Sequence, residues 1–138
     1  MKKIVFLLTC ILTLTVVSCE KHVTYDKLPQ KAKLFITNYF PENQVISVEK
    51  NGASYDVLLN DGTDLEFNRS GDWTEVNCQT RPVPVGIAPA AIQSYVMTNF
   101  PEAFIVKIKI ERKNYEVELN NDIELTFDKN GMLLYAED

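Results

Sequence analysis

The sequence predicts an α+β fold in which a unit of one helix and four strands occurs twice, forming an antiparallel sheet with both helices on one face. The first observation is a tandem repeat, because residues 29–73 align with residues 89–133 at an offset of 60 without a gap. The second is a change of period within each copy, from helical spacing of apolar residues to alternation of apolar and polar residues. The third is the set of short turns between the alternating segments, which require antiparallel neighbours.

Each copy begins with a predicted helix. The apolar residues at helical spacing are Leu28, Ala32, Phe35 or Ile36, and Tyr39 in the first copy, and Ile92, Tyr95 or Val96, and Phe100 in the second. Pro29 and Pro89 are tolerated in the first turn of a helix, whereas Pro41 and Pro101 end the helical runs.

The helix in each copy is followed by segments that alternate with a period of two. The inner positions are Val48, Tyr55, Val57, Leu59, Leu65, Phe67, Thr74 and Val76 in the first copy, and Val106, Ile108, Ile110, Tyr115, Val117, Leu119, Ile123, Leu125, Phe127, Leu134 and Ala136 in the second. Turn residues at 60–63, 68–71 and 128–131 separate them. The pattern predicts eight strands, with one face of the sheet packed on the helices and the other open to water.

The N-terminus has the order of a secretory signal. Lys2 and Lys3 precede an apolar and hydroxyl run that ends at Ser18-Cys19, and the run is short for a membrane span. Residues 16–19 resemble a bacterial lipobox, in which Cys19 is acylated, and an ordinary signal peptide cut near Ser18 is the alternative. The expected organisation is a signal peptide at 1–18, lipidated Cys19 with a polar tether at 19–27, repeat one at 28–78, a linker at 79–87 and repeat two at 88–138. The two repeats are expected to form one structural unit.

The charge argues against a nucleic-acid-binding protein, and the cysteine content argues against a protein stabilised by disulfides. Without Lys2 and Lys3 the mature chain has 12 basic and 19 acidic residues, a formal charge of −7, which repels nucleic acid. Cys10 leaves with the signal and Cys19 is assigned to the lipid, so Cys78 is left without an intramolecular disulfide partner. The sequence favours a buried, inert thiol at Cys78 over a reactive one.

A family resemblance rests on a motif present in both copies. The motif in the first copy is Leu28-Pro29, Asn38-Tyr39-Phe40-Pro41, residues 55–62, Leu65-Glu66-Phe67 and Gly71-Asp72-Trp73. It resembles the family of bacterial envelope proteins called putative beta-lactamase-inhibitor-like, PepSY-like. The resemblance implies the fold of the beta-lactamase inhibitor protein, which clamps an enzyme with the open face of its sheet. It does not carry the contact residues of that inhibitor onto this chain, and restraint of a peptidase, as in the more distant PepSY domains, is an analogy of fold.

The sequence offers no catalytic or metal-binding constellation, and we expect no cofactor. His22 is the only histidine and lies in the predicted tether, so a zinc site or a His-based triad cannot form within one chain. Glu116, Glu118 and Glu124 fall on outward strand positions, where solvated charge is the simplest interpretation. Residues 60–64 lack the alternating acidic residues of a calcium loop and are predicted to form a turn.

The open sheet face is the remaining candidate for function. By alternation it is expected to carry Leu58, Glu66, Trp73, Glu75, Lys107, Lys109, Glu116, Glu118, Glu124, Leu133 and Tyr135. Aromatic residues with interspersed charges are typical of interface centres. The alternative is that Trp73, Leu133 and Tyr135 only cover hydrophobic surface at a sheet edge or between the halves.

These observations predict a non-enzymatic, exported and lipid-anchored protein that binds a macromolecule of the cell envelope through its sheet. One alternative is an inhibitor of an envelope peptidase or hydrolase, and a second is an accessory protein that binds envelope glycans or peptides. The expected location is the periplasm or the outer membrane, with contact to the membrane only through the lipid. No nucleic-acid partner is expected.

Overall fold

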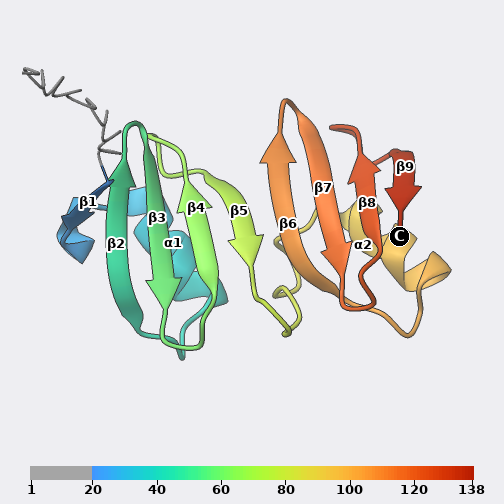
Figure 1. Ribbon diagram of the computed structural model, residues 1–138, viewed down its shortest axis with the longest axis horizontal. Helices are drawn as coiled ribbons and strands as arrows, with labels where there is room; N and C mark the ends of the chain where they lie inside the picture. The colour runs from blue at the N-terminus through green and yellow to red at the C-terminus, as the bar shows by residue number, and fades with distance from the viewer. Residues whose placement is uncertain (1–19) are drawn as a thin grey trace, which may run out of the picture.

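The computed structural model describes residues 20–138 and shows one antiparallel sheet of nine strands with both helices on one face (Figure 1). The strands lie in sequence order, and each pairs with the next. The first half contains β1 (Glu20–Val23), the 3-10 helix η1 (Tyr25–Lys27), α1 (Gln30–Tyr39), β2 (Val45–Asn51), β3 (Ser54–Leu59), β4 (Asp64–Phe67) and β5 (Trp73–Asn77). The second contains α2 (Ala90–Asn99), β6 (Ile105–Glu111), β7 (Asn114–Leu119), β8 (Glu124–Phe127) and β9 (Leu133–Glu137). The predicted α+β fold with a duplicated unit is confirmed.

β1 is the one strand beyond the eight that the sequence predicts, and it lies in the segment predicted to be a tether. β1 pairs antiparallel with β2, with Val23 opposite Val48, and Val23 packs against the hydrophobic core. The expectation of a tether at residues 20–27 is therefore wrong. β1 is only four residues long and has a single apolar residue, which is too short a pattern for alternation to be detected. The predicted signal peptide and Cys19 lie outside the described residues.

Prolines set both ends of the two helices. Pro29 and Pro89 occupy the N-cap positions, where the missing N–H costs no helical hydrogen bond. Each helix ends with a phenylalanine whose N–H donates to the carbonyl four residues earlier, at 2.8 Å for both Phe40 and Phe100. A proline follows each, so neither helix can continue.

The core is a continuous apolar row that crosses the sheet beneath the helices. Paired neighbours along the row from β2 to β8 are Val48, Val57, Leu65, Val76, Ile108, Val117 and Leu125. The two largest fully buried side chains, Phe67 and Phe127, are equivalent in the two copies. Each meets a helix aromatic edge-on, Phe35 at 5.5 Å and Tyr95 at 5.4 Å between ring centroids. The duplication therefore repeats side-chain packing as well as backbone.

Gly71 and Gly131 allow the turn before the last strand of each copy to touch its helix. Both have positive φ, +87° and +79°. A Cβ on Gly71 would lie 2.8 Å from the Pro29 Cβ, and one on Gly131 would lie 2.6 Å from the Ala91 Cβ. Only glycine satisfies both the left-handed backbone and the close approach to the helix.

The two copies form one sheet because β5 pairs with β6. The pairs are Glu75 with Lys109, Val76 with Ile108 and Asn77 with Lys107. Cys78 and the linker extend this contact, since the N–H groups of Cys78 and Val83 donate to the carbonyls of Val106 and Ile105 at 2.9 and 2.7 Å. Cys78 is 2% exposed, as expected for an inert thiol, and burial raises its pKa.

Candidate interaction face

Two rows of side chains cross the sheet on the face opposite the helices. Row one contains His22, Glu49, Asp56, Glu66, Glu75, Lys109, Glu116, Thr126 and Tyr135. Row two contains Ser47, Leu58, Asp64, Asn77, Lys107, Glu118, Glu124 and Glu137. Members of these rows flank the buried row in sequence, so strand alternation directs their side chains away from the helices. We call this surface the open face.

The open face is acidic across its width. The two rows contain nine carboxylates and only two lysines, Lys107 and Lys109, both on β6. Lys107 Nζ lies 3.6 Å from Glu75 Oε1, across the junction between the two copies. Lys109 Nζ lies 3.6 Å from Glu111 Oε2 on the same strand. The positive charge is therefore confined to the middle of the sheet, and both outer parts of the open face attract cations.

Both copies have hollows on the open face. A hollow of about 290 Å³ lies over β2 to β5 and includes Glu49, Leu58 and Glu66 in its lining. A hollow of about 190 Å³ lies over β6 to β9, and Lys109 and Tyr135 are among the residues that line it. Pockets that enclose drug-sized ligands are about 300–1,000 Å³. These two hollows are smaller than that, and a third, of about 380 Å³ and lined in part by Glu66, lies beside the β2–β3 and β4–β5 turns.

Nine of the eleven residues predicted for the open face lie in the two rows, whereas Trp73 and Leu133 lie on the opposite side. Trp73 packs against the core, with its ring centroid 6.4 Å from that of Phe35. Trp73 pairs with Phe67, and Thr74 is an extra residue that shifts the register before Glu75. This β-bulge breaks the alternation on which the prediction for Trp73 depends.

The same bulge recurs in the second copy. Leu133 pairs with Phe127 and packs against the core, while Tyr135 pairs with Thr126 on the open face. Leu134 is the extra residue and is 51% exposed. Of the three apolar side chains that the sequence suggests as an interface centre, only Tyr135 is on the open face.

Several members of the two rows were not predicted from the sequence. The main omissions are Glu49, Asp56, Asp64 and Glu137, each of which is next to an inner-face position of its strand. The alternation that identified Glu116 and Glu118 also identifies Glu49, Asp56 and Asp64 in the first copy and Glu137 at the end of the second. The acidic character of the whole face is therefore stronger than predicted.

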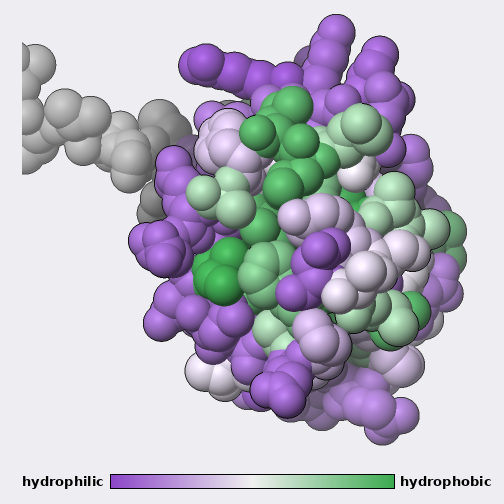
Figure 2. Space-filling model, turned by 90° about the vertical axis from the view of Figure 1, so that its right-hand side faces the viewer, coloured by the Kyte–Doolittle hydropathy of each residue, from purple (hydrophilic) through white to green (hydrophobic). Residues whose placement is uncertain are grey.

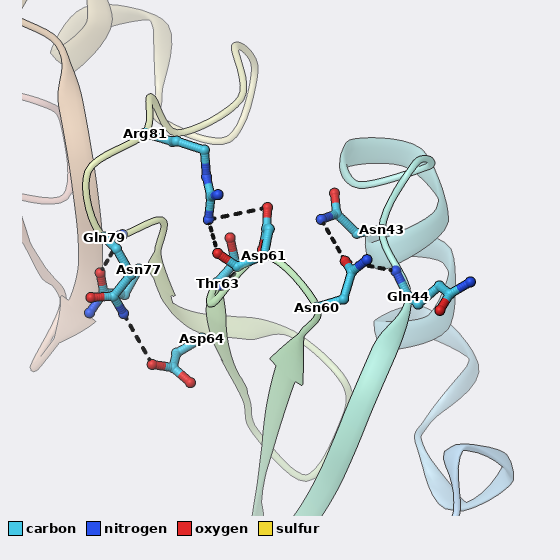
Figure 3. Close-up of polar contacts among 9 residues, drawn as sticks. All are labelled: Asn43, Gln44, Asn60, Asp61, Thr63, Asp64, Asn77, Gln79 and Arg81. Atoms are coloured by element: carbon cyan, nitrogen blue, oxygen red, sulfur yellow. Dashed lines mark hydrogen bonds and ion pairs between the residues drawn. The ribbon is translucent and has the colours of Figure 1, made fainter.

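Polar contacts fix one end of the open face to the linker (Figure 3). Asp61 Oδ1 accepts the Thr63 N–H at 2.9 Å, which closes the turn between β3 and β4. Arg81 extends from the linker so that its Nη2 lies 3.3 Å from Asp61 Oδ2, and it donates to the Asp61 carbonyl as well. Gln79 Nε2 donates to Asp64 Oδ2 at 3.2 Å. Residues 60–64 thus form the turn that the sequence predicts, and contacts from the linker brace it.

The pKa values of two aspartates near this turn are shifted in opposite directions. Partial burial raises the pKa of Asp64, and the nearby charge of Glu75 adds to the increase. For Asp61, burial acts in the same direction, but hydrogen bonds from Thr63 and Asn43 and the charge of Arg81 lower its pKa overall. The surroundings of Asp61 therefore stabilise its charged form, whereas burial and the charge of Glu75 disfavour the charged form of Asp64.

Other chemistry is limited in the part of the chain that the structure describes. Within residues 20–138, no three His, Cys, Asp or Glu side chains are grouped so that they could hold a metal ion. Over the same residues, neither helix has the length and apolar character needed to cross a bilayer. His22 lies at the edge of row one, with Nδ1 3.6 Å from Glu49 Oε1, and is exposed.

The fold and the duplicated motif correspond to a known family. The sequence matches the family described as putative beta-lactamase-inhibitor-like, PepSY-like over residues 15–57 and 53–135. The chain belongs to this family. A comparison with curated proteins finds no match.

Solved structures include close relatives of this PepSY-like protein. A "putative periplasmic protein" from Bacteroides vulgatus is 38% identical, with a TM-score of 0.85 over 88% of this chain and 99% of that one. A "putative calcium-regulated periplasmic protein" from Bacteroides thetaiotaomicron is also 38% identical, with a TM-score of 0.83 over 86% and 97% of the two chains. A second Bacteroides vulgatus protein is 36% identical, with a TM-score of 0.81 over 86% and 99%. These descriptions support an exported protein.

Proposed function

We propose that this PepSY-like protein is a non-enzymatic, lipid-anchored binding protein of the bacterial envelope whose open face engages a positively charged protein. The observation that supports the proposal is the pair of acidic rows, which extends over both copies and carries only two lysines. Charge complementarity accelerates the association of protein partners and discriminates against wrong ones. A neutral glycan would gain little from such a surface.

The position of β1 gives the proposed lipid anchor a geometric consequence. β1 begins at Glu20, immediately after the proposed acylated Cys19, and pairs with β2. An acylated chain would then be held with the β1 edge of the sheet beside the bilayer and with β9, the last strand of the sheet, farthest along it. Cys19→Ser should move the protein from the membrane fraction to the soluble fraction and remove its lipid mass shift, and a mutant that stays acylated would contradict the anchor.

The description calcium-regulated belongs to the relative from Bacteroides thetaiotaomicron, and the proposal does not include that property. Inhibition of an envelope peptidase or hydrolase is a special case of the proposal, in which the positively charged partner is an enzyme.

Photo-crosslinking in cells tests the proposed face. A crosslinking residue at position 66 in the first copy or at position 116 in the second, both in row one, should capture the same protein. Positions 42 and 102 are matched controls, because Glu42 and Glu102 are equivalent, exposed and just beyond the two helices. Capture of one basic protein from the first pair and not the second supports the proposal. Equal capture from both pairs, or capture of glycan alone, would contradict it.

A further inference from the structure

The outer edge of β9 is uncovered and apolar. Met132, Leu134 and Tyr135 are 65%, 51% and 53% exposed. Figure 2 looks onto this side of the molecule and shows apolar side chains gathered in the middle of it, with hydrophilic ones around them. Exposed edge strands are usually protected by charged residues, proline or bulges. The opposite edge follows that rule, since β1 carries exposed Lys21 and His22.

The first copy shows how such an edge can be filled. β5 is the counterpart of β9 at the offset of 60, and its outer edge pairs antiparallel with β6. β5 has the same bulge as β9 and still pairs beyond it, so the bulge does not prevent strand addition. Tyr135, Ala136 and Glu137 therefore correspond to three residues that are paired in the middle of the sheet.

The uncovered edge is more apolar than its covered counterpart. Asp72, Thr74 and Glu75 in the first copy are replaced at the equivalent positions of the second by Met132, Leu134 and Tyr135. Solvent exposure alone would favour the opposite distribution, with polar residues at the free edge. The composition of β9 is typical of a strand whose edge is covered by a binding partner.

The backbone of β9 can accept a further strand. The Cys78 N–H donates to the Val106 carbonyl at 2.9 Å, across the β5–β6 junction. Backbone groups of alternate residues point to the same side of a strand, so Val76 also directs its N–H toward β6. Ala136 is the counterpart of Val76, and its N–H and C=O therefore point outward from the sheet.

We propose that β9 is a docking edge that adds an extended segment of another protein as a tenth, antiparallel strand. The segment carries basic residues on the side of the open face and branched apolar residues on the side of the helices. Charge supports this choice, because Glu124 and Glu137 border the edge, and both lysines of the rows belong to β6, the strand that fills the equivalent edge. A second copy would instead bring another acidic face beside the first. This inference goes beyond the proposed function, since it concerns the edge of the sheet rather than its face.

A peptide with the sequence of residues 104–112, which contains β6, is a direct probe. The full mature chain is titrated with this labelled peptide, and binding is followed by fluorescence anisotropy. Ala136→Pro removes the outward N–H and leaves the ladder to β8 intact, whereas Ala136→Val introduces the residue found in β5 and keeps the N–H. Melting temperatures of both variants establish that the fold is retained.

We expect the wild-type protein and Ala136→Val to bind the peptide within about twofold of each other, and Ala136→Pro to bind it about tenfold more weakly or not at all. A peptide with both lysines replaced by glutamate should lose binding to a similar degree. The inference is overturned if Ala136→Pro binds as well as wild type, if the glutamate peptide binds equally, or if the wild type does not bind. A dimer in sedimentation that only Ala136→Pro abolishes, without peptide binding, would show that the edge pairs with a second copy instead. The charge-reversal variants of the open face, Glu66→Lys and Glu116→Lys, leave β9 unchanged. Their binding to the partner therefore tests the proposed function separately from the β9 edge.

Discussion

Truncation of Phe67 and of Phe127 to alanine tests whether the duplicated halves share one core. Both side chains are 0% exposed, and each has an edge-on aromatic contact with its own helix. Removal of a buried phenylalanine costs about 3–5 kcal/mol, and the lost aromatic pair accounts for about 0.5–1.5 kcal/mol of this. Because the two environments are so similar, the two variants should lose similar amounts of unfolding free energy.

The assay is urea unfolding followed by two signals. Trp73 is the only tryptophan and lies in the first half beside Phe35, so its fluorescence reports that half, whereas far-ultraviolet circular dichroism reports both halves. The β5–β6 pairing makes the sheet continuous, and both signals should therefore shift together in each variant, as in a two-state transition. Phe67→Leu and Phe127→Leu serve as controls with a smaller loss. If Phe127→Ala leaves the fluorescence transition unchanged while part of the dichroism signal moves, the halves unfold independently and the reasoning is refuted.

Three further outcomes follow from particular contacts. Gly131→Ala should destabilise the protein by about 1–3 kcal/mol in urea unfolding, because its φ is positive and a Cβ would clash with the helix, whereas Gly62→Ala, with nothing within 4 Å, should cost less. Trp73→Ala should lower the melting temperature and Tyr135→Ala should not, since only the former packs against the core; the reverse order would contradict the bulge. Asp64→Asn should raise the melting temperature at about pH 7 and leave it unchanged at about pH 3. The folded-state pKa of Asp64 is raised above 3.8, which gives stability that is present in acid and lost as pH rises. Equal effects at both pH values would exclude a charge origin.

The sequence was sufficient for the parts of the fold that depend on local pattern. Pro41 and Pro101 end the helices, and the alternation around Val117 identifies a strand with one buried face. The duplication then made each assignment twice, which is why the order of helices and strands is predicted correctly. The same alternation placed Glu116, Glu118 and Lys109 on the open face.

Features that depend on pairing between strands were not predictable in this way. Thr74 and Leu134 are extra residues only in relation to a neighbouring strand, and nothing in their own segments marks a bulge. The direction of Trp73 was therefore missed. β1 was missed because its pairing with β2 depends on a partner 25 or more residues away, at Val48 and beyond. Long-range register is set by the assembled core rather than by local propensity.

The affinity of the partner captured from the open face, measured as a function of salt, tests the central claim most directly. The double variant Glu66→Lys and Glu116→Lys is compared with the matched control Glu42→Lys and Glu102→Lys, which makes the same change in net charge away from the open face. The account predicts that the open-face variant binds at least about tenfold more weakly and that its affinity depends less on salt than that of wild type, while the control stays close to wild type. Equal weakening by both variants would mean that only net charge matters, and unchanged binding by the open-face variant would contradict the assignment of function to this face.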